Sequence, residues 1–565
     1  MNLYPSIDTQ KAEIRLLRLA PGRFDDPIVV TLQTACFERE PATEYVALSY
    51  VWGKEICPAS AVINGCAVSI TANLDSALRH IRHEIDHVIL WVDAICINQN
   101  DTGERNHQVQ LMARIYSSAK RVLVWLGPSA DGSDNVFESI KQRGSSKTQA
   151  PSFMASLGKL CQRPWFRRVW VVQEFALAKR DPDFVCGFST VSWTELYSFV
   201  RLVHSHLEPR VSPPSSLHHS DFRWLKVVLA EVDSSVGTAL TETAGQLYFL
   251  HETRNKAGKQ GFSAQFYRTR HFEATDPRDK VFAILSLCSF QQSPRTILPD
   301  YSKSVSEVFA EAMAVVILES PDFGYSRLPL PYYQFRPWGM DLPSWVPDMQ
   351  YLRETRPQCC HPYNPAQLAS RTLTSPISFS GDFRSLYAGG VIVATVKQTL
   401  ELKELRDILS YRRLLRDRPM ELQEGHILEW VKDPNFGYAE VNHDLSWFSR
   451  MAAMKVKAGN DDEALLGHIR DFFEVLSTQV NLCDHPRTVF LTDNGKIGVS
   501  PAEIKREDYL VELSESASPF VLRRSTPFWT MVNRTSFLGN LCPVALPQDL
   551  GYGKQRIGFQ RFEIR

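Results

Sequence analysis

The stretch Val88–Ile97 reads VILWVDAICI and decides the fold class. It is a nearly continuous apolar run rich in β-branched side chains, which is typical of a strand buried on both faces of a parallel sheet. Asp93 interrupts the run, and a buried carboxylate costs several kcal/mol unless it has a partner. We expect that partner to be Arg79 or Arg105. A structural ion pair and a role in a ligand pocket both remain open for Asp93.

Strand-like and helix-like segments alternate on both sides of this run. The apolar spacing predicts a helix over 71–82 with Thr71 or Asn73 as its N-cap. Asp101 and Glu104 form a D-x-x-E variant of the capping box and predict the start of a second helix. This order predicts an α/β fold, a parallel sheet with covering helices. The predicted strands lie in residues 14–19, 28–32, 45–52 and 121–127, with a hairpin over 62–70.

Composition narrows the classes of protein and partner. The chain has 565 residues, enough for about two to four domains. Its 63 Lys and Arg balance its 63 Asp and Glu, so nucleic acid is not an expected partner. We expect no membrane span and no secretory signal. Eleven cysteines without a CxxC pair favour reduced thiols in an intracellular compartment, and we assign no metal site.

The predicted secondary structure changes beyond about residue 187. Residues 188–350 have mainly helical periodicity, including helices predicted at Phe222–Val232 and Val305–Leu318. Residues 351–565 form a C-terminal region. Its short β-like runs separated by turns predict a small β-rich domain over about 485–565.

Polar and aromatic side chains close two of the predicted strands. Ser49, Tyr50 and Trp52 end one strand, and Asp93 breaks the next. Open parallel sheets bind ligands beyond the carboxyl ends of their strands, so these side chains are candidate binding residues.

Trp170 and Glu174 are four residues apart, so on a helix they share one face. A glutamate held against an aromatic wall can stabilise an oxocarbenium-like ribosyl centre or orient water onto it. The competing interpretation is a helix that packs Trp170 and exposes Glu174. For Glu104, the capping position in the first helical turn favours a structural role.

Several common catalytic motifs are absent from the sequence. It has no GxxxxGK[ST] loop, GxGxxG fingerprint, HExxH pair or GxSxG elbow. P-loop NTPases, ordinary dinucleotide dehydrogenases, zincins and simple α/β-hydrolases are therefore disfavoured.

A set of sequence blocks resembles the fungal heterokaryon-incompatibility (HET) domain. On this resemblance residues 1–187 are a HET domain with N-terminal strands, and 45–187 are its core. The blocks are YVALSYVWG (45–53), TANL (71–74), WVDAICINQ (91–99), VWLG (124–127), RPWF (163–166) and RVWVVQE (168–174). The motif also includes Asn98, Gln99, Glu104, Arg105 and Gln108.

Later segments are similar to those that follow the HET domain in long family members. They are TDPRDKVF (275–282), PDY (299–301), LPSWVPD (342–348) and a β-rich tail. The tail departs from the family pattern, because Glu507-Asp508 stands where a Gly-Asp pair is usual.

The resemblance implies a cytoplasmic fungal protein that triggers growth arrest and cell death when non-self is recognised after hyphal fusion. HET domains are distantly similar to Toll/interleukin receptor (TIR) domains, which implies a flavodoxin-type parallel sheet. In that comparison Glu174 falls where TIR enzymes place the glutamate that hydrolyses NAD. The resemblance thus implies a catalytic Glu174, a pocket shaped by Trp170, and Ser49 and Asp93 in contact with ribose or phosphate.

Two functions stay open at this point. The first is an NAD nucleosidase, with NAD as substrate and no bound cofactor. The second is a non-catalytic interaction module that signals by oligomerising or by binding a partner incompatibility protein. The expected partners are the product of an incompatibility locus or a second copy of this chain.

Overall fold

The computed structural model divides the chain into two compact units. The first unit is Met1–Gln292 with Thr296–Ser304, and the second is Ser293–Arg295 with Val305–Arg565. The predicted helix at Phe222–Val232 lies outside the described residues. The structure describes residues 3–37, 43–141, 150–207, 234–289, 296–319, 341–349, 377–402, 487–493, 497–500, 504–513, 520–534, 536–537 and 559–565.

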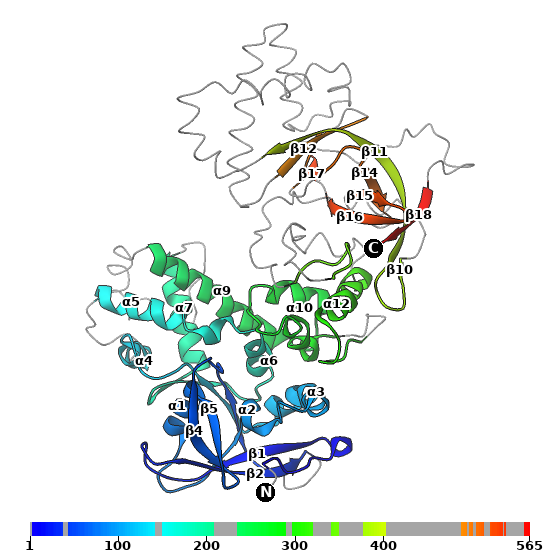
Figure 1. Ribbon diagram of the computed structural model, residues 1–565. Helices are drawn as coiled ribbons and strands as arrows, with labels where there is room; N and C mark the ends of the chain where they lie inside the picture. The colour runs from blue at the N-terminus through cyan, green and yellow to red at the C-terminus, as the bar shows by residue number, and fades with distance from the viewer. Residues whose placement is uncertain are drawn as a thin grey trace. The chain divides into compact units, whose positions relative to one another are not determined.

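The first unit is built on a nine-stranded mixed sheet with the order β5-β4-β2-β1-β6-β3-β7-β8-β9. Figure 1 labels β1, β2, β4 and β5 of this sheet. The four neighbours β6, β3, β7 and β8 are parallel, as the strand–helix alternation predicted for this part of the sheet. Numbered along the chain, they lie in the order 2-1-3-4. The strands are β1 (Glu13–Leu19), β2 (Ile28–Cys36), β3 (Val46–Ser49), β4 (Ile56–Ile63), β5 (Cys66–Thr71), β6 (Val88–Trp91), β7 (Arg121–Trp125), β8 (Asp183–Cys186) and β9 (Ser189–Ser192).

The expected parallel arrangement gives way to antiparallel pairs on both sides of these four strands. β1 pairs antiparallel with both β2 and β6, β4 with β5, and β9 with β8. Short connections explain three of these pairings, because a parallel neighbour needs a crossover of a dozen or more residues. The sheet is therefore mixed: β2 and β4 are also parallel, and the prediction of a parallel sheet is wrong for the four antiparallel pairs.

The VILWVDAICI run forms a strand followed by a helical turn, so the prediction of one continuous strand is wrong. β6 ends at Trp91, and the short helix α2 covers Asp93–Cys96. The chain turns here because the Asp93 side chain accepts a hydrogen bond from the Ala94 N–H at 2.7 Å, a pairing that favours turns over strands. Asp93 therefore begins a helix at the carboxyl end of β6.

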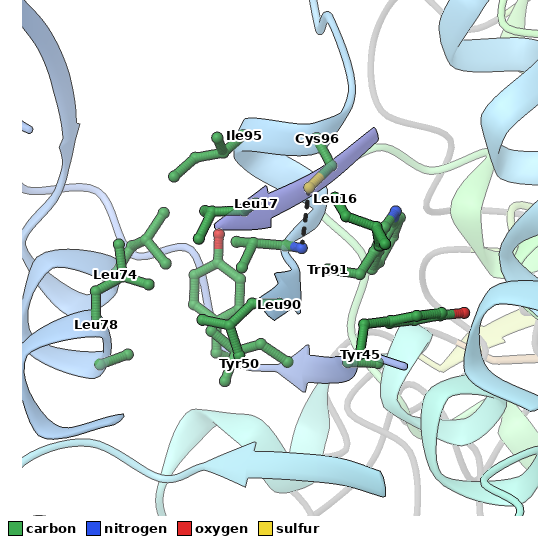
Figure 2. Close-up of a cluster of buried hydrophobic side chains, with 14 of the residues drawn as sticks. Leu16, Leu17, Tyr45, Tyr50, Leu74, Leu78, Leu90, Trp91, Ile95 and Cys96 are labelled. Carbon is green, nitrogen blue, oxygen red and sulfur yellow. Dashed lines mark hydrogen bonds between the residues drawn. The ribbon is translucent and has the colours of Figure 1, made fainter. Parts of the chain in front are cut away.

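Apolar side chains from the sheet and its helices form one core cluster (Figure 2). Leu16 and Leu17 of β1 lie beside Trp91 and Cys96. Each fully buried leucine contributes about 1.5–3 kcal/mol relative to an exposed one. The cluster fixes α2 against β1 and so fixes the place of Asp93.

The two helices predicted from capping residues are confirmed. α1 is Ala72–Ile81, and its N-cap Thr71 accepts a hydrogen bond from the Leu74 N–H at 3.4 Å. α3 is Thr102–Ser118, and Asp101 accepts from the Glu104 N–H at 3.0 Å. Side-chain oxygens at this position satisfy backbone N–H groups that have no partner within the helix.

The remaining helices of the first unit follow β7. The 3₁₀ turn η2 (Pro164–Arg167) leads into α6 (Trp170–Ala176), which packs against β3, α3 and α9. The others are α4 (Ser133–Lys141), α5 (Ala150–Cys161), α7 (Trp193–Leu207), α9 (Ser234–Lys256), α10 (Phe262–Thr269), α11 (Asp279–Phe282) and the 3₁₀ turn η4 (Leu285–Leu287). The short helix α6 therefore lies directly against the strand that ends in Ser49.

The second unit contains α12 (Val305–Glu319), which confirms the predicted helix, and a second sheet. The sheet order is β14-β15-β16-β18-β11-β12-β13-β17, with β10 paired to β11. Within the described ranges, no helix has both the length and the apolar character that crossing a bilayer requires. The strands are β10 (Ser378–Phe379), β11 (Leu386–Leu402), β12 (Arg487–Thr492), β13 (Ile497–Ser500), β14 (Tyr509–Leu513), β15 (Phe520–Ser525), β16 (Phe528–Arg534), β17 (Ser536–Phe537) and β18 (Phe559–Ile564).

The tail departure at Glu507 has a backbone consequence. Glu507 has a φ of +70°, in the left-handed region that favours glycine. The next residue, Asp508, is buried and pairs with Arg523 at 2.7 Å. The chain therefore forms this left-handed turn with a glutamate in place of a glycine.

Candidate functional site

Ser49 and Glu174 meet at the carboxyl end of β3. The Ser49 hydroxyl donates a hydrogen bond to Glu174 Oε2, and the Trp165 indole N–H donates to Ser49 Oγ at 2.8 Å. Ser49 is the last residue of β3, and Glu174 projects from α6. Only 2 % of Glu174 is exposed, so the interpretation in which α6 exposes this glutamate is wrong.

Burial raises the pKa of Glu174 to about 7. The positive charge of Arg168 and the hydrogen bond from Ser49 act in the opposite direction, while the charge of Asp93 raises the pKa further. Removing a carboxylate from water disfavours its charged form, which is why burial dominates. At neutral pH this carboxyl therefore both holds and releases a proton, as a general acid or base must.

Asp93 is bound by an indole. The Trp52 N–H donates to Asp93 Oδ2 at 2.8 Å, and 38 % of Trp52 is exposed. Burial raises the pKa of Asp93, and the charge of Arg168 is the largest effect opposing it. Two of the predicted binding residues, Trp52 and Asp93, are thus in direct contact.

Neither expected basic partner pairs with Asp93, so that prediction is wrong. Arg79 is bound to Asp75, four residues earlier on α1, at 2.8 Å. The Arg105 guanidinium lies 4.3 Å from the centre of the Tyr301 ring. Each arginine is thus engaged by another partner, and sequence spacing could not show that competition.

Tyr50 and Trp170 flank the Ser49–Glu174 contact without bonding to Glu174. Tyr50 is 1 % exposed, and burial, followed by the charge of Asp93, raises the pKa of its hydroxyl. Trp170 is part-buried against the core cluster. The structure therefore brings Ser49 and Glu174 into direct contact, whereas Trp170 is bonded to neither.

Arg168 is the functional residue that the sequence reasoning missed. Its guanidinium donates to the Tyr50 carbonyl. Its positive charge opposes the rise that burial causes in the pKa of both Asp93 and Glu174. Its only signal in the sequence was its place within the RVWVVQE block. The positive charge of one arginine thus acts on both acids.

The remaining motif residues support the backbone around this site. Glu104 pairs through both carboxylate oxygens with Arg15 of β1, at 2.6 and 2.9 Å. The Gln99 amide donates to the Asp93 carbonyl at 3.0 Å, and the Gln108 amide donates to the Glu13 carbonyl at 2.9 Å.

Asn98 contributes its backbone N–H, which donates to Glu104 at 2.7 Å. Glu104 therefore has a structural role and joins α3 to β1 and to Asn98, the residue after Ile97. It does this without the bond to the Asp101 N–H that a capping box would use, because that N–H donates to the Asn98 carbonyl. In the part of the chain that the structure describes, no three His, Cys, Asp or Glu side chains are grouped as a metal site would require.

Comparison with known proteins identifies the domain that carries the site. Residues 45–174 match the family described as "Heterokaryon incompatibility protein (HET)". The chain is similar to "Heterokaryon incompatibility protein 6, OR allele" from Neurospora crassa, with 28% identity over 424 residues. This match covers 61% of the present chain and 58% of that relative, so the chain spans somewhat over half of the relative's length. No solved structure matches. Residues 45–174 are therefore a heterokaryon-incompatibility domain, and Glu174 is its last matched residue.

Proposed function

We propose that this chain acts in the cytoplasm of a fungal cell in heterokaryon incompatibility, and that its Ser49–Glu174 site hydrolyses NAD. The role in incompatibility is supported by the domain over residues 45–174 and by the similarity to heterokaryon incompatibility protein 6. The enzymatic part rests on one observation. A buried glutamate with a pKa near 7 contacts the serine that closes a central parallel strand.

The strand order supports the proposal that the first unit has a TIR-like fold. The parallel strands β6-β3-β7-β8 have the order 2-1-3-4, which is how a flavodoxin-type sheet begins. In such sheets ligands bind beyond the carboxyl ends, where strand order reverses. Ser49 ends β3, which borders the switch point between β3 and β7, and Asp93 follows the neighbouring β6, so both candidate binding residues lie at the carboxyl edge of the parallel strands.

The reaction breaks the bond between the nicotinamide nitrogen and ribose C1′. The ring is already cationic, so it leaves as neutral nicotinamide with the bonding electrons and needs no general acid. Ionised Glu174 stabilises the oxocarbenium ion at C1′ and accepts a proton from the water that attacks it. Ser49 and Asp93 contact the ribose or a phosphate oxygen, and the products are nicotinamide, ADP-ribose and one proton.

The burial of Glu174 supports a second candidate function. With 2 % of the residue exposed, the resting site is closed to a dinucleotide. A closed site is compatible with an enzyme that opens on self-association or on binding an incompatibility partner. It also favours a domain that acts only by contact, in which Ser49 and Glu174 form a buried polar link that orients α6 on β3.

Nicotinamide release from NAD by the purified full-length chain separates the two functions. We expect release by the wild type after it is concentrated into assemblies, loss of release in Glu174→Gln, and wild-type release in Glu84→Gln. Glu84 is exposed and serves as the matched control. Cell death in a fungal host without a fall in NAD, or death unaffected by Glu174→Gln, would contradict the enzymatic function and support signalling by contact.

A further inference from the structure

Helix α6 is held at its start by a later segment of the first unit, which lies beyond the matched domain. This segment consists of residues 273–288 and 299–303, and we call it the strap. The Glu273 N–H donates to the Arg167 carbonyl at 2.5 Å, and the Val169 N–H donates to the Glu273 carbonyl at 2.9 Å. Two backbone hydrogen bonds therefore join the strap to the chain where α6 begins.

The middle of α6 is joined to the strap by a buried side chain. Gln173 is 2 % exposed, and its neighbours assign the orientation of its amide. The amide nitrogen donates to the Ala283 carbonyl at 3.2 Å and to the Ser286 hydroxyl at 3.0 Å, and the amide oxygen accepts from the Ala113 N–H of α3 at 3.1 Å. The residue next to Glu174 along the chain is therefore bound to the strap through two hydrogen bonds.

Hydrogen bonds within the strap join its two parts. The Tyr301 hydroxyl donates to Asp279 at 2.6 Å, and the Arg278 guanidinium donates to the Tyr301 carbonyl at 2.8 Å. Lys280 is 5 % exposed, and its ammonium group donates to the Phe272 carbonyl, directly before the bridge to α6. The part of the strap that contacts α6 is therefore bonded to the part that contains Tyr301.

That second part of the strap is bound to α3. Asn106 Oδ1 accepts from the Tyr301 N–H at 2.8 Å, and the Asn106 amide donates to Asp300 at 3.0 Å. The Arg105 guanidinium lies 4.3 Å from the centre of the Tyr301 ring. Helix α3 is in turn joined to β1 by the ion pair at its first turn. While these bonds last, the strap cannot follow α6 away from β3, so α6 leaves β3 only by breaking its bonds to the strap.

We propose that the strap holds the Ser49–Glu174 site closed by keeping α6 on β3, and that the site opens when the bonds between α6 and the strap break. The proposal rests on the proposed function, because it states how access to that site is controlled. Glu174 is 2 % exposed, so a conformation that admits a dinucleotide differs from this one. Bonds made only in the closed conformation stabilise it against the open one, so weakening them raises the open population.

Hydrogen–deuterium exchange of the full-length chain, measured by mass spectrometry, detects this opening without activity. Ser286→Ala, at an exposed position, removes one acceptor of the Gln173 amide. We expect peptides of α6 to exchange about fivefold faster, as the loss of one hydrogen bond in the closed state predicts. Ser302→Ala is the matched control, because this exposed serine of the strap donates to Asp300 and has no bond to α6. It should leave the α6 rates unchanged.

Tyr45→Phe separates local opening from general destabilisation. The Tyr45 hydroxyl is buried outside the strap and donates to the Ile115 carbonyl at 2.6 Å. Its loss should speed exchange in β7, which opens with the whole unit, and leave the α6 rates unchanged. Unchanged α6 rates in Ser286→Ala would overturn the proposal. Equal acceleration of α6 by Tyr45→Phe would also overturn it, because α6 would then open only with the whole unit.

Glu273→Pro is a second test at the other contact between the strap and α6. Proline removes the N–H that donates to the Arg167 carbonyl, whereas Glu273→Ala changes the side chain and keeps that N–H. We expect faster α6 exchange in the proline variant than in the alanine variant. Equal exchange of α6 in the two folded variants would contradict a holding role of this bond.

Nicotinamide release then distinguishes this proposal from the proposed function. If the assembled wild type releases nicotinamide, Ser286→Ala should release it faster at the same protein concentration, by up to about fivefold. Slower or unchanged release, together with faster α6 exchange, would overturn the role of the strap in access to the site. If neither protein releases nicotinamide, the proposed enzymatic function fails, while faster exchange of α6 in Ser286→Ala still supports the strap as what holds α6 closed.

Discussion

Arg15 and Glu104 form a buried two-point ion pair between the first strand of the sheet and helix α3. The side chains are 2 % and 9 % exposed, and the nitrogen–oxygen distances are 2.6 and 2.9 Å. Arg15 also donates to the Cys96 carbonyl at 3.1 Å and to the Pro5 carbonyl at 2.7 Å. Strand β1, which precedes the matched domain, is therefore bonded to the short helix α2, which begins at Asp93.

Removing one member of this pair should strongly destabilise the first unit. We expect Glu104→Gln to lower the free energy of unfolding by about 3–5 kcal/mol, because it leaves the buried Arg15 charge without a counter-ion. Urea unfolding followed by circular dichroism measures the change. Glu44→Gln is the control, since its pair with Lys120 is exposed and should contribute less than about 1 kcal/mol. Equal effects of the two variants would contradict the prediction.

Stability should fall as pH rises toward neutrality, because of Glu174. Its pKa is about 7 in the folded chain against an ordinary value of 4.5, so between these values the folded state keeps a proton that the unfolded state has lost. The free energy of unfolding should drop by about 3 kcal/mol across this range from this group alone. Glu174→Gln should remove that part of the slope, while the exposed Glu84→Gln should retain it. A wild-type slope in Glu174→Gln would argue against the raised pKa.

Ser49→Ala should raise the pKa of Glu174 and destabilise the first unit. The hydroxyl both stabilises the ionised Glu174 and accepts the Trp165 N–H, so its loss leaves a buried indole donor unpaired. We expect a loss of about 1–3 kcal/mol in unfolding experiments and an infrared band of protonated Glu174 that persists to higher pH. Ser117→Ala, at an exposed position, is the matched control. It should neither lower the free energy of unfolding nor move the Glu174 band to higher pH. A Glu174 band at its wild-type pH in Ser49→Ala would contradict the assigned hydrogen bond.

Glu507→Gly should stabilise the second unit. A side chain at φ of +70° costs roughly 1–2 kcal/mol, and glycine removes that cost while adding backbone entropy to the unfolded chain. We expect a net gain of about 0.5–1 kcal/mol, seen as a higher Tm of the second unit in calorimetry. Glu507→Ala keeps a Cβ atom and should give no gain. An equal gain from alanine would place the effect in the glutamate charge instead of the backbone.

Local sequence signals predicted the elements whose cause is local. Thr71 and Asp101 are the N-caps of α1 and α3 because a short oxygen-bearing side chain at that position satisfies the first turn. The end of β6 was predicted wrongly, since the apolar run continues into α2, where the Ile95 and Cys96 N–H groups donate to the Val92 carbonyl and Asp93 accepts from the Ala94 N–H. Burial alone did not distinguish strand from helix over these residues.

The site was predictable only in part, for a different reason. Ser49, Asp93 and Glu174 follow from strand ends and from the family resemblance. The contact of Arg168 with the Tyr50 carbonyl joins residues 118 positions apart, which no periodicity records. The prediction of Arg79 or Arg105 as the partner of Asp93 was wrong because a long arginine side chain can reach several groups, and the tertiary fold determines which of them it binds.

The bonds of Tyr301 also set a mechanical limit. The longer segment of the second compact unit begins at Val305, so residues 302–304 are the chain between α12 and the tyrosine that donates to Asp279. Three residues of extended chain span about 10 Å. Tyr301, held by its hydrogen bonds to Asn106 and Asp279, is therefore a fixed anchor of the first unit within that length of chain from the start of α12.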